Sequence, residues 1–208
     1  YKCKHNKGMN IMNYRKQIEI HLKKSGGIIT SAYCRENNIP TVYLSRLAKE
    51  GKLFRVQKGI YIIEDGDYDE YYFFQYQYKK AIFSYETALF LLGVTDKIPW
   101  RIDVTVYNGY KFNEKQDTLN INYVKKSIYN LGIIQKKTMF GNTVNVYSYE
   151  RILCDFISNK EKMDTEVYVK LIRSYFKYKD KDIHSLYKIA RKMGIEDKVR
   201  EVMEVVYE

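Results

Sequence analysis

Glycine and proline divide the first third of the chain into short segments, and their spacing limits the folds that it can adopt. Ser25-Gly26-Gly27 ends a first amphipathic stretch, since glycine takes the left-handed conformation that closes a helix. Pro40 ends a second stretch, because a residue before proline is disfavoured in the α region. Gly51 ends a third. We therefore predict helices over 13–24, 30–37 and 42–50, with Thr30 and Thr41 as N-caps of the second and third.

The next residues have the pattern of a β-hairpin. LFRVQ (53–57) and IYII (60–63) read as two strands, and Lys58-Gly59 supplies the turn between them. Three helices, with a tight turn between the second and third, followed by a two-stranded ribbon, are the order of a winged helix-turn-helix. The predicted fold class is α+β, with a winged helix-turn-helix domain over 13–66 and a mixed α+β domain after it.

Charge is distributed very unevenly along the chain. The first 63 residues hold 13 Lys and Arg against three acids, whereas the remaining residues hold 23 against 22. The change is abrupt, because EDGDYDE (64–70) follows at once. A basic segment joined to a balanced one predicts two domains, of which the first faces a polyanion.

The third predicted helix separates apolar from polar side chains. Leu44, Leu47 and Gly51 fall on one face and are expected to pack inward. The opposite face offers hydroxyls and cations that suit phosphates and base edges in a major groove, with Tyr43 at its flank. Arg46 is the candidate for a base contact, and the wing would contact the flanking backbone. The predicted DNA-binding residues are Thr41, Tyr43, Ser45, Arg46, Lys49, Arg55 and Lys58; Lys16, Lys23, Lys24 and Arg35 add charge toward phosphates.

Each of these side chains, taken singly, has an ordinary alternative, because the charged faces of small helices are usually just solvated. Tyr43 is equally compatible with the edge of a core. It is the whole arrangement of helices, wing and charge that favours DNA.

Residues 67–80 are dense in aromatic side chains. Such a stretch could stack single-stranded bases, but the preceding acids would repel a phosphate backbone. We therefore expect an interdomain helix that packs its tyrosines.

The pattern from 81 onward mixes helices and strands and ends in helices. Ser84 and Gly93 begin and end a helix in SYETALFLLG. Strands are expected at 101–107, 119–124, 132–137 and 143–147, and helices near 149–158, 164–178, 183–193 and 196–206. Asp164 and Asp182 are expected N-caps, and Gly194 a terminator. This predicts an α+β domain over 81–208, helical at its C-terminal end.

Several functional classes find little support in the sequence. The three cysteines are widely spaced, which suits a reducing cytoplasm, and no apolar run is long enough for a membrane span. The basic residues 1–12 form an N-terminal extension, expected to be disordered. The histidines do not have metal-ligand spacing, and phosphate-loop or nucleophile motifs are absent from the sequence. We expect no metal, no cofactor and no catalytic residues.

Four stretches together carry a family resemblance. GGIIT (26–30), IPTVYLSRLAKEGKLFRVQKGIYII (39–63), AIFSYETALFLLGVTD (81–96) and YERILCDFI (149–157) resemble the AbiE-family antitoxin. That family is the transcription-regulating partner in a type IV abortive-infection toxin–antitoxin pair, which acts in phage defence. The resemblance runs from about residue 13 through most of the chain.

The resemblance implies two activities. The winged helix would bind inverted repeats in its own promoter and repress the operon, through the residues of the third helix and wing. The second domain would counteract a nucleotidyltransferase-like toxin, around Ser84, Glu86, Arg151 and Asp155, with or without direct contact. For those four residues a structural role is the favoured alternative: Ser84 and Glu86 at a helix N-terminus, and Arg151 with Asp155 as an i,i+4 ion pair.

The expected protein is thus a cytoplasmic autorepressor and antitoxin, monomeric in solution and pairing on DNA. The alternatives are a stand-alone winged-helix regulator with a ligand-sensing or assembly domain, and a nucleic-acid-processing enzyme. For the enzyme, Asp155 with Glu196-Asp197-Lys198 resembles a nuclease pattern, but Glu50-Gly51-Lys52 matches the same pattern by chance.

Overall fold

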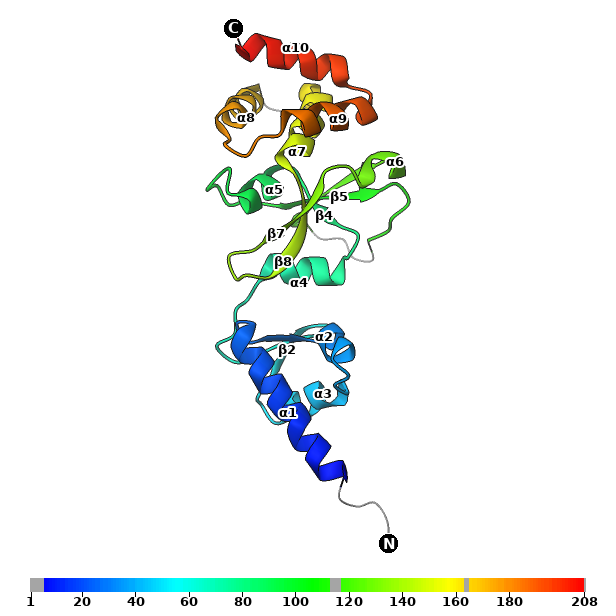
Figure 1. Ribbon diagram of the computed structural model, residues 1–208, viewed down its shortest axis with the longest axis vertical. Helices are drawn as coiled ribbons and strands as arrows, with labels where there is room; N and C mark the ends of the chain where they lie inside the picture. The colour runs from blue at the N-terminus through cyan, green and yellow to red at the C-terminus, as the bar shows by residue number, and fades with distance from the viewer. Residues whose placement is uncertain (1–5, 113–116, 163–164, 208) are drawn as a thin grey trace. The chain divides into compact units, whose positions relative to one another are not determined.

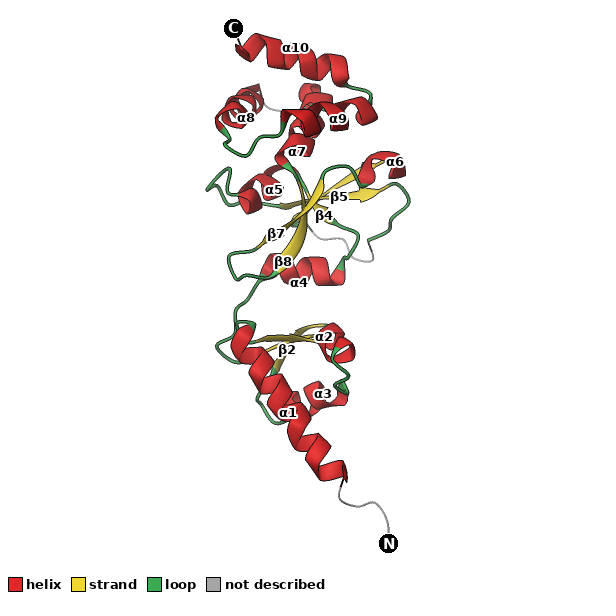
Figure 2. Cartoon of the chain, viewed as in Figure 1, coloured by secondary structure: helices red, strands yellow, loops and turns green. Residues whose placement is uncertain are grey.

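The protein was analysed as a computed structural model, which describes residues 6–112, 117–162 and 165–207 (Figures 1 and 2). The chain forms two compact units. Unit 1 comprises the chain up to Gln77 together with Lys137–Asn142. Unit 2 comprises Tyr78–Lys136 and the chain from Thr143 onward.

Unit 1 has the predicted winged helix-turn-helix order. Its three strands pair in the order β1-β3-β2, all antiparallel, and the β2–β3 hairpin is the wing. Its elements are α1 (Asn6–Lys24), β1 (Ile28–Thr30), α2 (Ser31–Glu36), α3 (Val42–Lys49), β2 (Phe54–Gln57), β3 (Ile60–Ile62) and α4 (Glu70–Gln77).

Most of the helix ends and turns predicted for unit 1 are confirmed. Thr30 caps α2, its hydroxyl accepting a hydrogen bond from the Tyr33 amide at 3.1 Å. Gly27 has a φ of +80°, and a Cβ there would lie 2.9 Å from the Gly66 backbone, so only glycine fits this close approach. The helices enclose one apolar core around Ile18, Ile29 and Leu44.

Two local predictions for unit 1 were wrong. Thr41 is already helical, at φ −62° and ψ −16°, and makes no capping hydrogen bond. The turn that leads into α3 begins one residue earlier, at Pro40, whose carbonyl accepts a hydrogen bond from the Tyr43 amide at 3.1 Å. The first helix also begins at Asn6 rather than at 13, and residues 1–5 lie outside the described part.

The acidic run leads into α4, and one of its acids is fully buried. Asp69 caps α4, because its Oδ1 accepts from the Tyr72 amide at 3.1 Å. Its Oδ2 accepts from the Thr138 hydroxyl at 2.5 Å and from the Asn142 amide at 2.8 Å. These bonds attach the 137–142 turn to unit 1.

Unit 2 is built on a five-stranded mixed sheet of order β6-β5-β4-β8-β7. β5 is antiparallel to β4 and parallel to β6, and β4 is parallel to β8. The strands are β4 (Ile82–Phe83), β5 (Ile102–Tyr107), β6 (Leu119–Val124), β7 (Ile133–Lys137) and β8 (Thr143–Tyr147). The helices are α5 (Tyr85–Leu92), α6 (Lys126–Tyr129), α7 (Tyr149–Ser158), α8 (Thr165–Lys177), α9 (Ile183–Met193) and α10 (Glu196–Tyr207), with a 3₁₀ turn at Lys160–Lys162.

Helix α7 is the centre of the helical end of unit 2. It contacts α5, α8, α9 and α10, and every residue from Tyr149 to Ile157 is buried. Complete burial requires its polar side chains to be paired inside the protein.

The four long strands and the C-terminal helices of unit 2 match the prediction. Gly93 and Gly194 end α5 and α9 in the left-handed conformation, and Asp182 caps α9. The short β4 and α6 were not predicted, because two to four residues carry too little periodicity. The predicted cap Asp164 lies outside the described residues.

Candidate functional site

The exposed face of α3 carries the predicted polar residues. Ser45, Arg46 and Lys49 are exposed together with Val42, while Leu44 and Leu47 are buried. Neither Arg46 nor Lys49 belongs to an ion pair found among the described residues. A cation without an acidic partner keeps its charge available for a phosphate or a base edge.

Tyr43 lies in the core, whereas the sequence placed it at the flank of the exposed face. Only 6% of its surface is exposed, and its ring packs 5.6 Å from the Tyr14 ring. The Arg46 guanidinium lies over the same ring at 5.4 Å, a cation–π distance. The buried Tyr43 ring therefore packs against the Arg46 guanidinium and does not face solvent.

An ion pair neutralises the acid that follows α3. Arg15 of α1 holds both Glu50 oxygens, at 2.6 and 3.1 Å, and Lys52 lies 3.6 Å from the same carboxylate. The Arg15 hydrogen bond lowers the pKa of Glu50, which keeps the carboxylate ionised. The pair thus removes much of the repulsion that a lone Glu50 would exert on an anion at α3. The sequence did not indicate this role for Arg15, because the two residues lie 35 positions apart.

The wing presents the other two predicted cations. Arg55 and Lys58 are both exposed, Arg55 on β2 and Lys58 in the turn. The register shifts between Arg55 and Gln57, so a β-bulge bends the strand just before the turn. Thr41 is half-buried at the N-terminus of α3, and its hydroxyl makes no capping bond.

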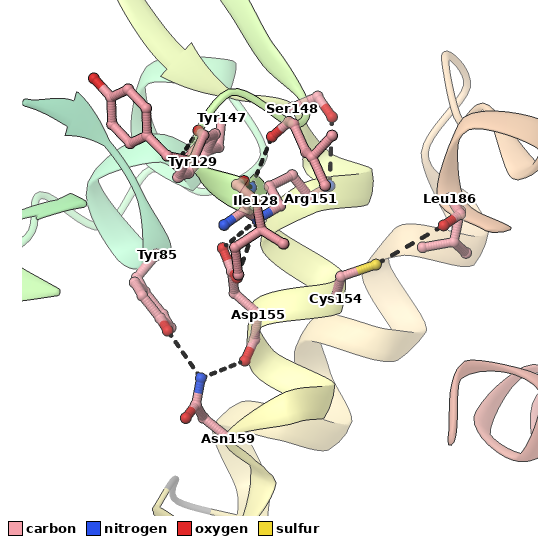
Figure 3. Close-up of polar contacts among 11 residues, drawn as sticks. Tyr85, Ile128, Tyr129, Tyr147, Ser148, Arg151, Cys154, Asp155, Asn159 and Leu186 are labelled. Carbon is pink, nitrogen blue, oxygen red and sulfur yellow. Dashed lines mark hydrogen bonds and ion pairs between the residues drawn. The ribbon is translucent and has the colours of Figure 1, made fainter. Parts of the chain in front are cut away.

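In unit 2, Arg151 and Asp155 form the predicted i,i+4 ion pair, deep inside the protein (Figure 3). Arg151 is fully buried, and its Nε lies 3.1 Å from each Asp155 oxygen. Its Nη1 donates to the carbonyls of Ile128 and Leu131, the latter at 2.8 Å. The guanidinium also lies 4.3 Å from the centre of the Tyr147 ring.

These contacts give Arg151 and Asp155 a structural role. The guanidinium joins α7 to the chain around α6 and to β8; Arg151 is fully buried and Asp155 nearly so. Burial raises the pKa of Asp155 to about 6, against the opposing effect of Arg151.

Ser84 and Glu86 stand at the N-terminus of α5, as predicted, but Ser84 does not cap it. The buried Ser84 hydroxyl makes no hydrogen bond within the described residues. The Asp103 carboxylate takes its place and accepts backbone hydrogen bonds from Glu86 and Thr87. Glu86 is half-buried and pairs with Lys97 at 3.7 Å. Among the described residues, no hydrogen bond joins Ser84 or Glu86 to Arg151 or Asp155.

Two cysteines lie in the described part, and both are buried. Burial raises the pKa of the Cys34 thiol to about 11 and that of Cys154 to about 12. A thiol held protonated in this way is a poor nucleophile. The described residues also contain no cluster of three or more His, Cys, Asp or Glu that could hold a metal ion.

Comparison with protein families identifies the segment that carries the exposed helix. Residues 16–63 match the family described as "Transcriptional regulator, AbiEi antitoxin". The resemblance to the AbiE-family antitoxin is confirmed over this segment. The AbiEi match spans α2, α3 and the wing, with most of α1, and it supports a role as antitoxin and transcriptional regulator.

A solved structure shares the fold beyond the AbiEi segment. The RV2827C protein from Mycobacterium tuberculosis matches with a TM-score of 0.50 and 11% sequence identity, over 89% of this chain and 77% of that one. At this identity the likeness concerns the fold alone. No curated protein sequence matches the chain.

Among the described residues, no helix is both long enough and apolar enough to cross a membrane.

Proposed function

We propose that the chain is a DNA-binding autorepressor and antitoxin. Its winged helix binds inverted repeats in its own promoter, and unit 2 counteracts a nucleotidyltransferase-like toxin. The observation that carries the DNA-binding part is the exposed face of α3, where Arg46 and Lys49 stand without acidic partners inside the AbiEi-matching segment.

The physical argument starts from electrostatics. A protein that neutralises phosphates releases condensed counterions, and this supplies much of its affinity for DNA. The first 63 residues contain most of the chain's excess of positive charge, and the Arg15–Glu50 pair masks the acid nearest to α3. Arg46 lies on the exposed face with its guanidinium above the Tyr43 ring, so less side-chain entropy is lost when it forms a bidentate contact with guanine.

In this proposal the DNA contacts come from Arg46, Lys49, Ser45 and Thr41 in and before α3. Arg55 and Lys58 of the wing contact flanking phosphates. Tyr43 acts indirectly, because its buried ring positions Arg46. The protein is a monomer in solution, and inverted repeats bring two copies together.

The antitoxin part of the proposal rests on the AbiEi match, and the buried Arg151–Asp155 pair contributes to it only by holding unit 2 together. The surface that acts against the toxin is therefore expected outside that pair. We propose no catalytic step for either unit.

Co-expression with the adjacent toxin gene tests both parts in one strain. The double variant Arg46→Ala/Lys49→Ala should lose promoter repression and still rescue growth, because it alters only the exposed face of α3. The control Lys188→Ala/Lys192→Ala removes the same charge from exposed positions of α9 and should retain repression. Equal repression by both double variants would refute the DNA-binding site. Failure of the wild type to rescue growth would refute the antitoxin role.

A further inference from the structure

Unit 2 contains an open cleft of about 670 Å³ beside β5 and β6. A cleft of this size suits a small-molecule ligand. Its lining combines amide, carboxylate, phenol, indole and guanidinium groups, from Asn120, Asn122, Asp103, Tyr85, Trp100 and Arg101. None of these side chains takes part in the DNA-binding face of α3, so the cleft requires its own explanation.

The register of two parallel strands places the hydrogen-bond acceptors in one row. Asp103 lies opposite Asn120 and Thr105 opposite Asn122. The Asn120 amide nitrogen donates to the Asp103 carboxylate at 3.0 Å, and the Asn122 amide nitrogen donates to the Val104 carbonyl at 3.4 Å. Each asparagine thus uses one of its two amide N–H groups inside the protein. Among the described residues no hydrogen bond reaches either carbonyl oxygen, so both can accept from a ligand in the cleft.

Asp103 adds to the acceptor character of the cleft. It is buried, and its carboxylate accepts from Asn120 and from the backbone of Glu86 and Thr87. Burial raises its pKa to about 6, so at neutral pH the group is mainly ionised and can only accept. A ligand that matches this side of the cleft must bring N–H or O–H donors.

Tyr85 lines the remaining wall of the cleft, and its backbone has an unusual conformation. Tyr85 has a φ of +45°, a strained region for a bulky residue that persists only where the surroundings hold it. The Tyr85 hydroxyl accepts from the Asn159 amide at 3.1 Å (Figure 3). Its own proton remains available to donate.

The rim pairs a planar ring with a cation. Trp100 is 92% exposed and lines the cleft, and the next residue, Arg101, is exposed and lines it too. An exposed indole offers a stacking surface for a base, and a guanidinium suits a phosphate.

We propose that this cleft binds an unpaired nucleobase together with its 5′-phosphate. The base stacks on Trp100, its exocyclic amino group donates to the carbonyls of Asn120 and Asn122, and Arg101 contacts the phosphate. The inference does not rest on the DNA-binding role of α3, which concerns duplex DNA and the other unit.

Trp100 is the single tryptophan of the chain, so its fluorescence reports on this cleft alone. The full-length protein is titrated with AMP, CMP, GMP, UMP and ribose 5-phosphate. AMP, CMP and GMP should quench the fluorescence saturably. UMP lacks the amino group and should bind about five- to tenfold more weakly, the effect of one lost hydrogen bond. Absence of saturable quenching, or equal quenching by ribose 5-phosphate, would overturn the proposal.

Variants separate the roles of the base and the phosphate. Asn122→Leu should weaken AMP about five- to tenfold, with the unfolding midpoint measured to confirm that the sheet is intact. Arg101→Ala lies at an exposed position and should weaken AMP but not adenosine. Ile98→Ala is the control, because Ile98 is 70% exposed in the same loop and does not line the cleft. Wild-type affinity in both Asn122→Leu and Arg101→Ala would contradict the assignment.

The base can come from a free nucleotide or from a single-stranded RNA. The same fluorescence titration with a five-nucleotide oligoadenylate distinguishes these sources, because neighbouring nucleotides add backbone contacts. Tighter binding of the oligonucleotide than of AMP assigns the cleft to an RNA strand. Equal or weaker binding assigns it to free nucleotides. Quenching by neither would refute the proposal.

Discussion

Two arginines, one in each unit, are used in opposite ways. Arg46 is exposed on α3 and is not paired with an acid in the described structure, with only an aromatic ring beneath it. Arg151 is fully buried in α7, where a carboxylate, two carbonyls and an aromatic ring surround it. Unit 1 thus exposes the Arg46 guanidinium to solvent, whereas unit 2 surrounds the Arg151 guanidinium with its own contacts.

The difference shows how to separate functional from structural charge. An exposed, unpaired cation contributes little to folding but can contribute strongly to binding, whereas a buried paired one does the reverse. The family resemblance implied a functional role for both arginines, although the i,i+4 spacing of Arg151 and Asp155 already favoured a structural one. Only burial and partners distinguish them.

The largest expected effect is the loss of stability in Arg151→Met. The substitution leaves Asp155 buried without its cation, which costs about 3–5 kcal/mol of unfolding free energy. Arg191→Ala is the control, because its pair with Glu196 is solvent-exposed and is worth at most about 1 kcal/mol. Chemical denaturation measures both. Similar losses in the two variants would remove the distinction between buried and exposed arginine.

A smaller effect is expected when Arg46 is replaced. Arg46→Ala should cost about 1–3 kcal/mol of DNA binding and relax the sequence preference, while stability stays unchanged. Lys58→Ala should weaken all duplexes about equally, because it contacts phosphates. Binding to the promoter and to a scrambled duplex gives the comparison. Identical specificity profiles for the two variants would contradict these roles.

Asp103 is also a buried carboxylate, but among the described residues it has no ion pair with an arginine, so it can be compared with the paired Asp155. The pKa of Asp103 is about 6 in the folded protein and near 3.8 when unfolded, so the folded state holds a proton that the unfolded state releases. Stability from this group is present below about pH 4 and is lost as pH rises through about 6. The difference in unfolding free energy between wild type and Asp103→Asn should therefore fall over that range, by on the order of 1–3 kcal/mol. If the difference in unfolding free energy between the two proteins does not change with pH, the Asp103 carboxyl is exposed to solvent and its pKa is not raised.

The smallest effect concerns the exposed pair beside α3. Arg15→Ala should weaken DNA binding by less than about 1 kcal/mol, because it unmasks the Glu50 carboxylate near the phosphates. Adding Glu50→Gln should restore the affinity, and the double variant is therefore the control. If the double variant binds as weakly as Arg15→Ala, the masking explanation fails.

The sequence predicted the winged helix well because its signals are local. Glycine turns, a proline and a capping threonine fix where α2 and the hairpin begin and end. The Thr41 cap failed because Pro40 starts the turn one residue earlier. The helical wheel left Tyr43 open between the exposed face and the edge of the core, because it does not show that the Tyr14 ring of α1 covers this position.

The contacts between distant segments could not be predicted from the sequence. The cleft depends on β5 lying parallel to β6, which sets Asp103 opposite Asn120, and no turn residue specifies that pairing. Asp69 reads as one acid of a solvated run, yet it binds Thr138 and Asn142 from a turn about 70 residues away. The domain limits at 66 and 80, and the DNA-contacting residues themselves, stay predictions.

The central claim, that the exposed cationic face of α3 binds duplex DNA, is tested most directly by the salt dependence of binding to the promoter duplex. Fluorescence anisotropy of the wild type should give a steep log–log slope, about −0.9 for each phosphate neutralised. Lys58→Ala should reduce the magnitude of that slope by about one such unit. A flat response of the wild type between 50 and 200 mM salt, roughly the range over which such proteins lose most affinity, would contradict the account.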